Sequence, residues 1–295
     1  MVEPSDANTR PPAVAGRFYP ADAEECRRQA QSFLKPRADA SDQRWLGAMV
    51  PHAGWICSGA VAGQAIATLA AQGPVDLIVI FGAVHTPIPV QHAALDPHGS
   101  WAMPGHPARI AKDLYGRLES RGNLFAVDGR LHEQEHSIEV NVPMVQLAFP
   151  GVPVLPIEVP AIGAAELMGR KTAECVAETG LRAIYLASTD LTHYGPTYGF
   201  TPAGVGPAGI EWARQNDCRL LKLIDELAAE KIVPEVQQHH NACGAGAVAA
   251  LLGACRQLGA TSARLLWHTN SYETLANVHP QPPTNAVGYA AVAIG

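Results

Sequence analysis

The order of apolar and polar positions along the chain predicts alternating strands and helices. Short runs rich in β-branched residues are typical of buried strands, and they occur at 77–81, 152–159, 183–187, 264–268 and 286–294. Apolar residues recur with the helical period at 58–71, 107–121, 164–179, 209–230 and 245–258. This alternation predicts an α/β fold in which helices cover both faces of a central sheet.

Two long loops are expected within this pattern. Prolines and glycines cluster at 87–107 and at 196–209, and both stretches are predicted to be loops inside one domain rather than linkers between domains. Long loops in a compact α/β protein often border a functional site. The sequence contains no internal repeat and no low-complexity tract, so a single domain is expected.

Polar clusters follow three of the apolar runs. His52 follows LGAMV, His85 follows LIVIF, and the segment 189–194, which contains Asp190 and His193, follows AIYLAS. Open α/β sheets bind ligands beyond the carboxyl ends of their strands. We therefore expect these imidazoles to point towards one crevice.

One cysteine stands out from the other five. Cys243 immediately precedes the predicted helix at 245–258, and the partial positive charge at a helix N-terminus favours a thiolate, which can bind metal. The remaining cysteines are expected to be buried and inert. All six are scattered along a long chain, which predicts reduced thiols rather than a disulfide scaffold.

Composition and charge exclude several classes of function. The chain has 295 residues, of which 47% are hydrophobic and 16% charged, as in ordinary globular proteins. A net charge of -6 gives no support for a nucleic-acid partner. No apolar run reaches the roughly 18 residues of a spanning helix, and the N-terminus lacks the features of a signal peptide. We expect a cytoplasmic protein with no membrane partner.

A rival site is possible at 132–136. The sequence HEQEH satisfies zinc-protease motifs in which two histidines one helical turn apart bind metal. The β-branched residues downstream and Pro143 argue against a helix through this segment. Glu158, in a predicted strand, is an unconvincing third ligand. A zinc hydrolase that uses His132 and His136 is therefore the least favoured alternative. His239 and His240 are predicted to form a solvated turn and remain candidates for supporting the site from outside.

Six ordered blocks resemble the Memo family, also called AmmeMemoRadiSam system protein B, whose fold is similar to that of the class III extradiol dioxygenases. They are AVAGRFYP at 13–20, PHAGW at 51–55, GAVHT at 82–86, EHSIEVNVP at 135–143, STDLTHY at 188–194 and ACGAG at 242–246. The resemblance implies a flexible N-terminus at 1–12 and one Memo-like domain at 13–295, with a central mixed sheet flanked by helices. Within the blocks, GAVHT departs from the more common Gly-Pro-x-His form and Trp55 stands where Tyr is common.

The resemblance also implies roles for individual residues. His52 and His85 become metal ligands, and Cys243 takes the third position, where the dioxygenases place a glutamate. His193 matches the acid/base of the dioxygenases, and Asp190 would orient groups in the same site. His136 matches a pocket histidine that faces oxygen and substrate. Glu139 is expected to be a supporting carboxylate.

Two imidazoles and one thiolate suit zinc, copper or ferrous iron better than magnesium or calcium. The leading hypothesis is a mononuclear metal protein, with Fe(II) favoured, that uses O2 to oxidise a small aromatic substrate. The alternative, from a different class, is a non-catalytic protein that binds copper or iron or interacts with a peptide. The family name further implies a partner protein and a radical SAM enzyme.

Overall fold

The computed structural model describes residues 8–35, 43–280 and 282–295. The strands are β1 (Thr9–Arg10), β2 (Gly47–Val50), β3 (Leu77–Ala83), β4 (Ala93–Leu95), β5 (Ser100–Trp101), β6 (Ala108–Arg109), β7 (Phe125–Val127), β8 (Val154–Val159), β9 (Ala183–Ser188), β10 (His193–Tyr194), β11 (Ala263–Asn270) and β12 (Ala286–Ile294). The α-helices are α1 (Ala23–Phe33), α2 (Trp55–Ala70), α3 (Tyr115–Glu119), α4 (Val142–Ala148), α5 (Ala165–Ala177), α6 (Pro207–Asp225), α7 (Ala229–His239), α8 (Ala245–Gln257) and α9 (Ser271–Thr274). Short 3-10 turns are η1 (Lys112–Leu114), η2 (Gly129–Leu131), η3 (Glu139–Asn141) and η4 (Pro196–Tyr198).

A mixed sheet forms the centre of the molecule. Its strand order is β10-β12-β2-β9-β3-β8-β4-β7, with β11 paired to β12. Strands β2, β9, β3 and β8 run parallel, whereas β12 and β4 pair antiparallel with their neighbours in this group. The carboxyl ends of the parallel strands therefore meet at one edge of the sheet, where a ligand site is expected.

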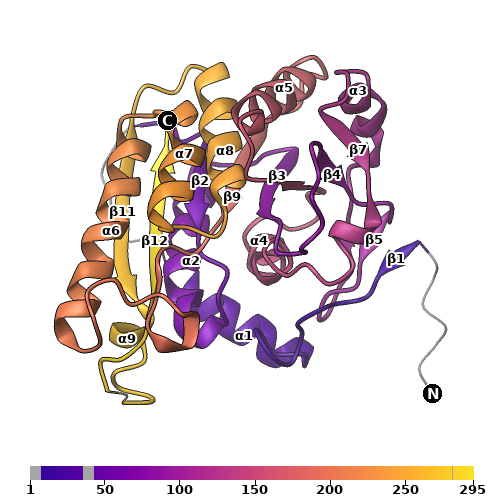
Figure 1. Cartoon of the computed structure of the whole chain (residues 1–295). Helices are drawn as coiled ribbons and strands as arrows, with labels where there is room; N and C mark the ends of the chain where they lie inside the picture. The colour runs from indigo at the N-terminus through magenta and orange to yellow at the C-terminus, as the bar shows by residue number, and fades with distance from the viewer. Residues whose placement is uncertain (1–7, 36–42, 281) are drawn as a thin grey trace.

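Helices cover both faces of this sheet (Figure 1). One group contains α5, α7 and α8, and α8 packs on β9 and β3; the other contains α1, α2 and α4, and α2 packs on β2 and β12. Strand β3 is buried along its whole length, as expected for a parallel strand covered on both faces. A smaller sheet with the order β1-β5-β6 lies beside this core. The predicted single-domain α/β fold with a central mixed sheet is confirmed.

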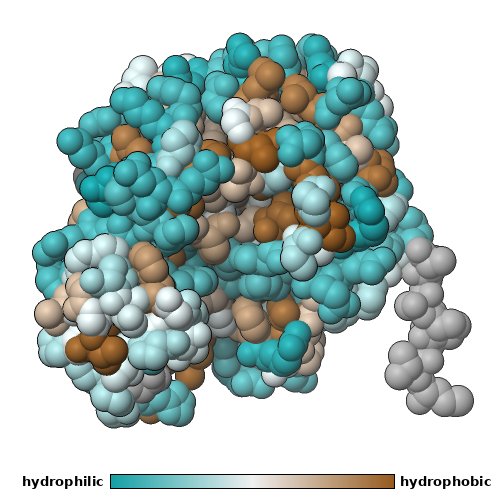
Figure 2. All heavy atoms as spheres, viewed as in Figure 1, coloured by the Kyte–Doolittle hydropathy of each residue, from teal (hydrophilic) through white to brown (hydrophobic). Residues whose placement is uncertain are grey.

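The surface fits this layered arrangement. Figure 2 shows mostly hydrophilic residues on the face seen in Figure 1, with hydrophobic residues gathered near its centre, between α4 and α5. Among the described residues, no helix combines the length and the apolar character needed to cross a lipid bilayer.

Most of the expected elements are present, with three corrections. The predicted helix at 107–121 is wrong, because its first residues form strand β6 against β5 and only α3 is α-helical. The helix predicted at 209–230 ends at Asp225, and Leu227 turns the chain with a positive φ of 51° before α7 begins. The loop predicted at 87–107 contains strands β4 and β5, which pair within the two sheets.

The N-terminal boundary also differs from the expected one. Of the predicted flexible segment 1–12, residues 1–7 lie outside the described residues. Thr9 and Arg10, however, pair with β5, and Arg10 is buried at 1% exposure. The folded domain therefore begins before Ala13.

Candidate metal centre

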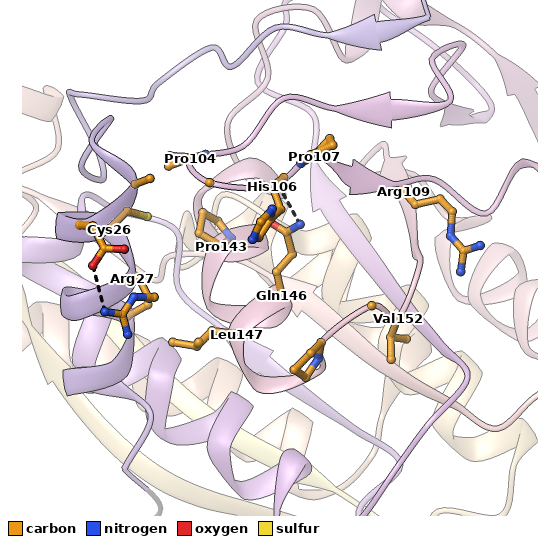
Figure 3. A pocket seen from close by; sticks show the side chains of 16 residues that line it. Cys26, Arg27, Pro104, His106, Pro107, Arg109, Pro143, Gln146, Leu147 and Val152 are labelled. Atoms are coloured by element: carbon orange, nitrogen blue, oxygen red, sulfur yellow. Dashed lines mark hydrogen bonds and ion pairs between the residues drawn. The ribbon is translucent and has the colours of Figure 1, made fainter.

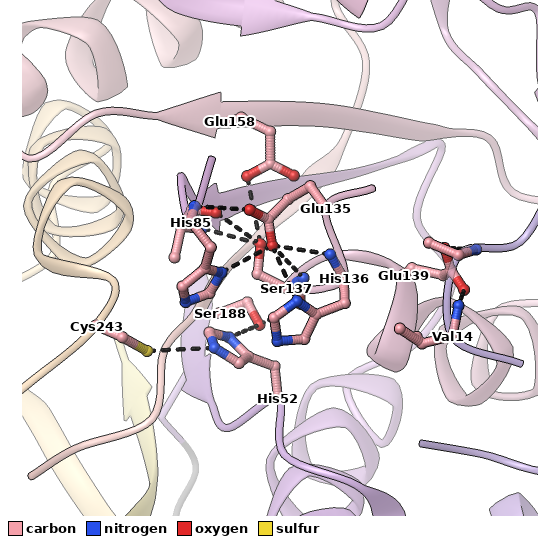
Figure 4. Close-up of polar contacts among 12 residues, drawn as sticks. Val14, His52, His85, Glu135, His136, Ser137, Glu139, Glu158, Ser188 and Cys243 are labelled. Atoms are coloured by element: carbon pink, nitrogen blue, oxygen red, sulfur yellow. Dashed lines mark hydrogen bonds and ion pairs between the residues drawn. The ribbon is translucent and has the colours of Figure 1, made fainter. Parts of the chain in front are cut away.

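Two histidines and one cysteine meet where β2 and β3 end (Figure 4). His52 and His85 each lie two residues beyond their strand, and their ring centroids are 5.2 Å apart. Cys243 immediately precedes Gly244, the N-cap of α8, and its Sγ lies 3.2 Å from His52 Nε2. One ligand atom from each of the three residues lies within 4.8 Å of the others. The expected convergence of these side chains is therefore observed.

The hydrogen bonds of Ser188 set the proton position on His52. Ser188 Oγ donates to the carbonyl of Ser137 at 2.6 Å and accepts from Asn141 Nδ2 at 3.1 Å. Because its own hydrogen is used, Ser188 Oγ accepts a hydrogen bond from His52 Nδ1 at 3.1 Å. The Nε2 atom of His52 therefore faces Cys243.

Glu135 orients the ring of His85 through hydrogen bonds. Its Oε1 accepts from His85 Nδ1 at 2.9 Å and from the backbone N–H groups of His136 and Ser137, while Oε2 accepts from the backbone N–H of His85 at 2.8 Å. Although burial opposes ionisation, these donors lower the pKa of the Glu135 carboxyl to about 2. A carboxylate behind a histidine is a common way to orient that histidine towards a metal.

The sulfur of Cys243 lies in an environment that favours the thiolate. Burial raises its pKa, but the neighbouring His52 and a hydrogen bond from His85 outweigh this effect and lower the pKa to about 6. The backbone N–H of Asp190 also donates to Sγ at 3.3 Å. Burial opposes protonation of His85, but its hydrogen bonds to Cys243 and Glu135 raise the pKa of the imidazole to about 11. Without metal, the pair is therefore a thiolate and an imidazolium at neutral pH.

His136 and Asp190 border the same centre. The His136 ring lies 4.8 Å from that of His85 and 5.3 Å from that of His52, measured between centroids. Burial, followed by the charge of His52, lowers the pKa of His136 to about 4, so its ring is neutral at pH 7. Asp190 Oδ1 accepts from the backbone N–H groups of His52 and Ala53 at 2.8 and 3.3 Å. Asp190 therefore holds the loop that carries His52.

His193 and Cys243 line the same pocket. The pocket has a volume of about 450 Å³, and its wall combines aromatic and aliphatic residues: Leu191, His193, Tyr198, Gly199, Phe200, Val236, His240, Ala242 and Cys243. His193 Nε2 is buried and has no hydrogen-bond partner among the described residues. Burial lowers the pKa of this imidazole, which favours a neutral ring in the pocket that Cys243 also lines.

The structure places one expected residue elsewhere. Glu139 does not touch the histidines; it pairs with Arg10 at 2.6 Å and accepts from Tyr19 Oη at 2.9 Å. Glu135, rather than Glu139, accepts a hydrogen bond from a histidine ring of the centre. Sequence reasoning missed Glu135 and Ser188, although Glu135 directly precedes His136 in the EHS block.

The rival site at 132–136 lacks the helix it requires. These residues lie between η2 and η3 and are not α-helical. His132 is buried, with Nε2 3.0 Å from the carbonyl oxygen of Ala94, whereas His136 lies beside His85. Glu158 lies in β8, as expected. Among the described residues, no metal-binding group contains both His132 and His136.

The remaining sequence candidates lie outside the centre. His239 accompanies Arg219 and Glu235 near the surface, while His240 lines the pocket. The six cysteines, all within the described residues, form no disulfide. A separate cavity of about 400 Å³, lined in part by Cys26, lies between α1 and α4 (Figure 3). It contains the Arg27–Glu24 pair and none of the predicted site residues.

Comparison with known proteins identifies relatives along the whole chain. The family model for Memo-like protein matches residues 10–293. MEMO1 family proteins of Thermococcus kodakarensis and Pyrococcus horikoshii are each 32% identical, over 96% of this chain and 98% of theirs. The MEMO1 family protein of Methanosarcina barkeri is 30% identical, over 97% of this chain and 99% of its own.

A solved structure supports the fold alone. The crystal structure of an uncharacterized protein from Escherichia coli K12 superposes with a TM-score of 0.53 at 14% identity, covering 85% of this chain and 100% of that one. The match of the family model over nearly all of the sequence, together with relatives of similar length, shows that the chain belongs to the Memo family.

Proposed function

We propose that His52, His85 and Cys243 bind one divalent metal ion, with Fe(II) the favoured metal, and that the protein uses it for O2-dependent oxidation of a small aromatic compound. The observation that carries this proposal is the convergence of three donor atoms within 4.8 Å. Both imidazoles present Nε2 to the same point as the cysteine sulfur, since each Nδ1 is already held by Ser188 or Glu135.

The donor set fits a transition metal. Imidazole and thiolate favour iron, copper or zinc over magnesium and calcium. Because the three donor atoms lie within 4.8 Å of one another, one ion of this class would be within reach of all three.

Three protein ligands leave positions open for small molecules. A bound ferrous ion would supply the electron chemistry that O2 requires, as it does in sites with two histidines and one carboxylate. The thiolate keeps the charge of that carboxylate but can itself be oxidised.

The surrounding residues of this chain then have separate tasks. Neutral His193 accepts or donates a proton through its free Nε2, and neutral His136 borders the side where oxygen and substrate would bind. Asp190 keeps the loop of His52 in place.

The pocket beside Cys243 favours a planar aromatic substrate. Tyr198 and Phe200 contribute aromatic rings to its wall, and Phe200 is itself packed against Trp212 at 5.7 Å between centroids. Stacking on a fixed ring favours aromatic ligands. A hydroxyl group on that ligand would give His193 Nε2 the hydrogen-bond partner that it lacks.

Metal content measured on protein purified without oxygen tests the first half of the proposal. Wild type should hold about one metal per chain, and His52→Ala, His85→Ala and Cys243→Ala should each lose it. His132→Ala should keep it, since this residue faces Ala94 rather than the centre. Retention of metal in the first three variants, or its absence from wild type, would overturn the metal site.

A non-catalytic metal-binding protein is the second candidate. The observation in its favour is the thiolate, because a soft, oxidisable ligand suits copper storage or sensing. Oxygen consumption by the iron-loaded protein with catechol discriminates between the two. Turnover that His193→Gln reduces at unchanged iron content supports the enzyme, whereas tight metal binding without turnover across catechols and aminophenols favours the binding protein.

A further inference from the structure

We infer that the N-terminal segment 10–19 contributes to metal binding, because it holds in place the loop 132–139 that orients both histidine ligands. Arg10 is the positioning residue of this arrangement. The inference rests on the proposed metal site, and it adds a dependence of metal affinity on a side chain that touches none of the ligands.

Arg10 binds both ends of the turn that carries Glu135. Its Nε donates to the carbonyl of His132 at 2.8 Å, and its Nη2 donates to the carbonyl of Glu135 at 2.6 Å. The guanidinium also lies 4.3 Å from the centre of the Trp101 ring. The planar fork of arginine holds acceptors in a fixed geometry from three separate nitrogens, whereas the donors of lysine share a single nitrogen.

Glu139 closes the same turn from its other side. Its carboxylate accepts from Arg10 Nη1 at 2.6 Å and from the backbone N–H groups of Ala13 and Val14 at 2.8 and 2.9 Å. Arg10 and Glu139 are 1% and 0% exposed, respectively. A buried pair of this kind is strongly disturbed when one partner is removed, because the other charge is left uncompensated.

The loop between these two anchors reaches both imidazoles. The Glu135 carboxylate accepts from His85 Nδ1, and the Ser137 carbonyl accepts from Ser188 Oγ, which holds His52 Nδ1. Ser137 Oγ also accepts from the backbone N–H of Ala83 at 3.0 Å, at the end of β3. A shift of this loop therefore displaces the supports of both metal ligands together.

Arg10→Lys tests the inference while keeping a positive charge beside Glu139. Arg10 reaches Glu139 and the two carbonyl groups from three different nitrogens, which the single nitrogen of lysine cannot reproduce, so the loop loses at least one anchor. The affinity for Co(II) should fall about tenfold, which is the smallest effect usually seen when a residue that supports a metal ligand is changed. Chelator competition measures this affinity, with thiolate-to-cobalt absorption as the signal. Met168→Ala is the control, because Met168 is fully buried on α5 and its loss reduces stability without touching the loop.

Hydrogen exchange in the metal-free protein gives a second readout. The backbone N–H groups of His85, His136 and Ser137 all donate to the Glu135 carboxylate. In Arg10→Lys these amides should exchange at least tenfold faster than in wild type, whereas the amide of Val248 in α8 should be unchanged. Met168→Ala should leave the three amides as they are.

The outcomes separate this inference from the proposed function. Wild-type Co(II) affinity and unchanged exchange in Arg10→Lys would overturn the inference while leaving the metal site intact. Failure of wild type to bind Co(II) would overturn the proposed metal function, and the exchange of the three amides would still decide whether Arg10 organises the loop.

Discussion

Replacing Glu135 by glutamine should weaken both the metal site and the metal-free fold. The carboxylate receives hydrogen bonds from the ring and backbone of His85 and from the backbone of His136 and Ser137. A glutamine amide would place an NH2 group against some of these N–H donors and leave them unsatisfied. The substitution therefore removes the charge while keeping the size of the side chain.

The magnitude follows from the pKa of this carboxyl. Folding lowers it from the ordinary 4.5 to about 2, and at about 1.36 kcal/mol per pKa unit this corresponds to about 3 kcal/mol of stability at neutral pH. Because the folded-state pKa is depressed, this stability is present above pH 4.5 and is lost as the pH falls towards 2. At pH 3 about half of it should remain.

Urea unfolding of the metal-free protein at pH 7 and pH 3 measures this effect. Glu135→Gln should be less stable than wild type by about 3 kcal/mol at pH 7 and by about half as much at pH 3. Glu133→Gln, two residues away and exposed, should unfold like wild type at both values. An equal penalty at the two pH values would refute the electrostatic reasoning.

Metal affinity gives an independent measurement on the same variants. Loss of the carboxylate behind His85 should weaken metal binding by about 10- to 100-fold, which is about 1.4 to 2.8 kcal/mol. Chelator competition measures this directly. Wild-type affinity in Glu135→Gln would show that Glu135 does not orient a metal ligand.

Three further predictions follow from the same geometry. The pKa of Cys243 is about 6 and that of His85 about 11, so binding of a divalent metal at pH 7.5 should release about one proton. The heat of binding measured by calorimetry should then differ between buffers of different ionisation enthalpy. Equal heats would contradict the thiolate–imidazolium pair. Ser188→Ala should reduce metal affinity about tenfold. It should also lower the free energy of unfolding in urea by about 1 to 3 kcal/mol, because the buried groups that bond to the Ser188 hydroxyl lose their partner. An unchanged metal affinity would show that Ser188 does not support the site. Gly169→Ala should destabilise the fold by about 1 to 3 kcal/mol, because a Cβ there would lie 1.8 Å from a backbone oxygen of α8. The control is Gly116→Ala, where a Cβ meets nothing within 4 Å. An equal melting temperature for the two variants would be inconsistent with close packing of α5 on α8.

Local patterns fail where pairing partners are distant in the sequence. The apolar spacing at 107–121 is compatible with a helix, but Ala108 and Arg109 pair with β5 instead. There, tertiary contacts override a weak local preference. The turn at Leu227 is instead a local helix cap, in which the N–H groups of Leu227 and Ala228 donate to the carbonyls of Ile224 and Leu223. Glycine usually marks such a cap, and leucine stands here.

The α/β architecture could be predicted from the sequence because strand periodicity is a local property. The histidines that follow strands were expected at one edge of the sheet, and the resemblance to the Memo family implied the ligand set His52, His85 and Cys243. Which carboxylate contacts the centre could not be predicted in this way. Glu135 and Glu139 are four residues apart, yet one accepts from His85 and the other from Arg10. That difference depends on how the loop 132–139 lies between β3 and the N-terminal segment, because hydrogen bonds between residues far apart in the chain form only once the fold has brought them together.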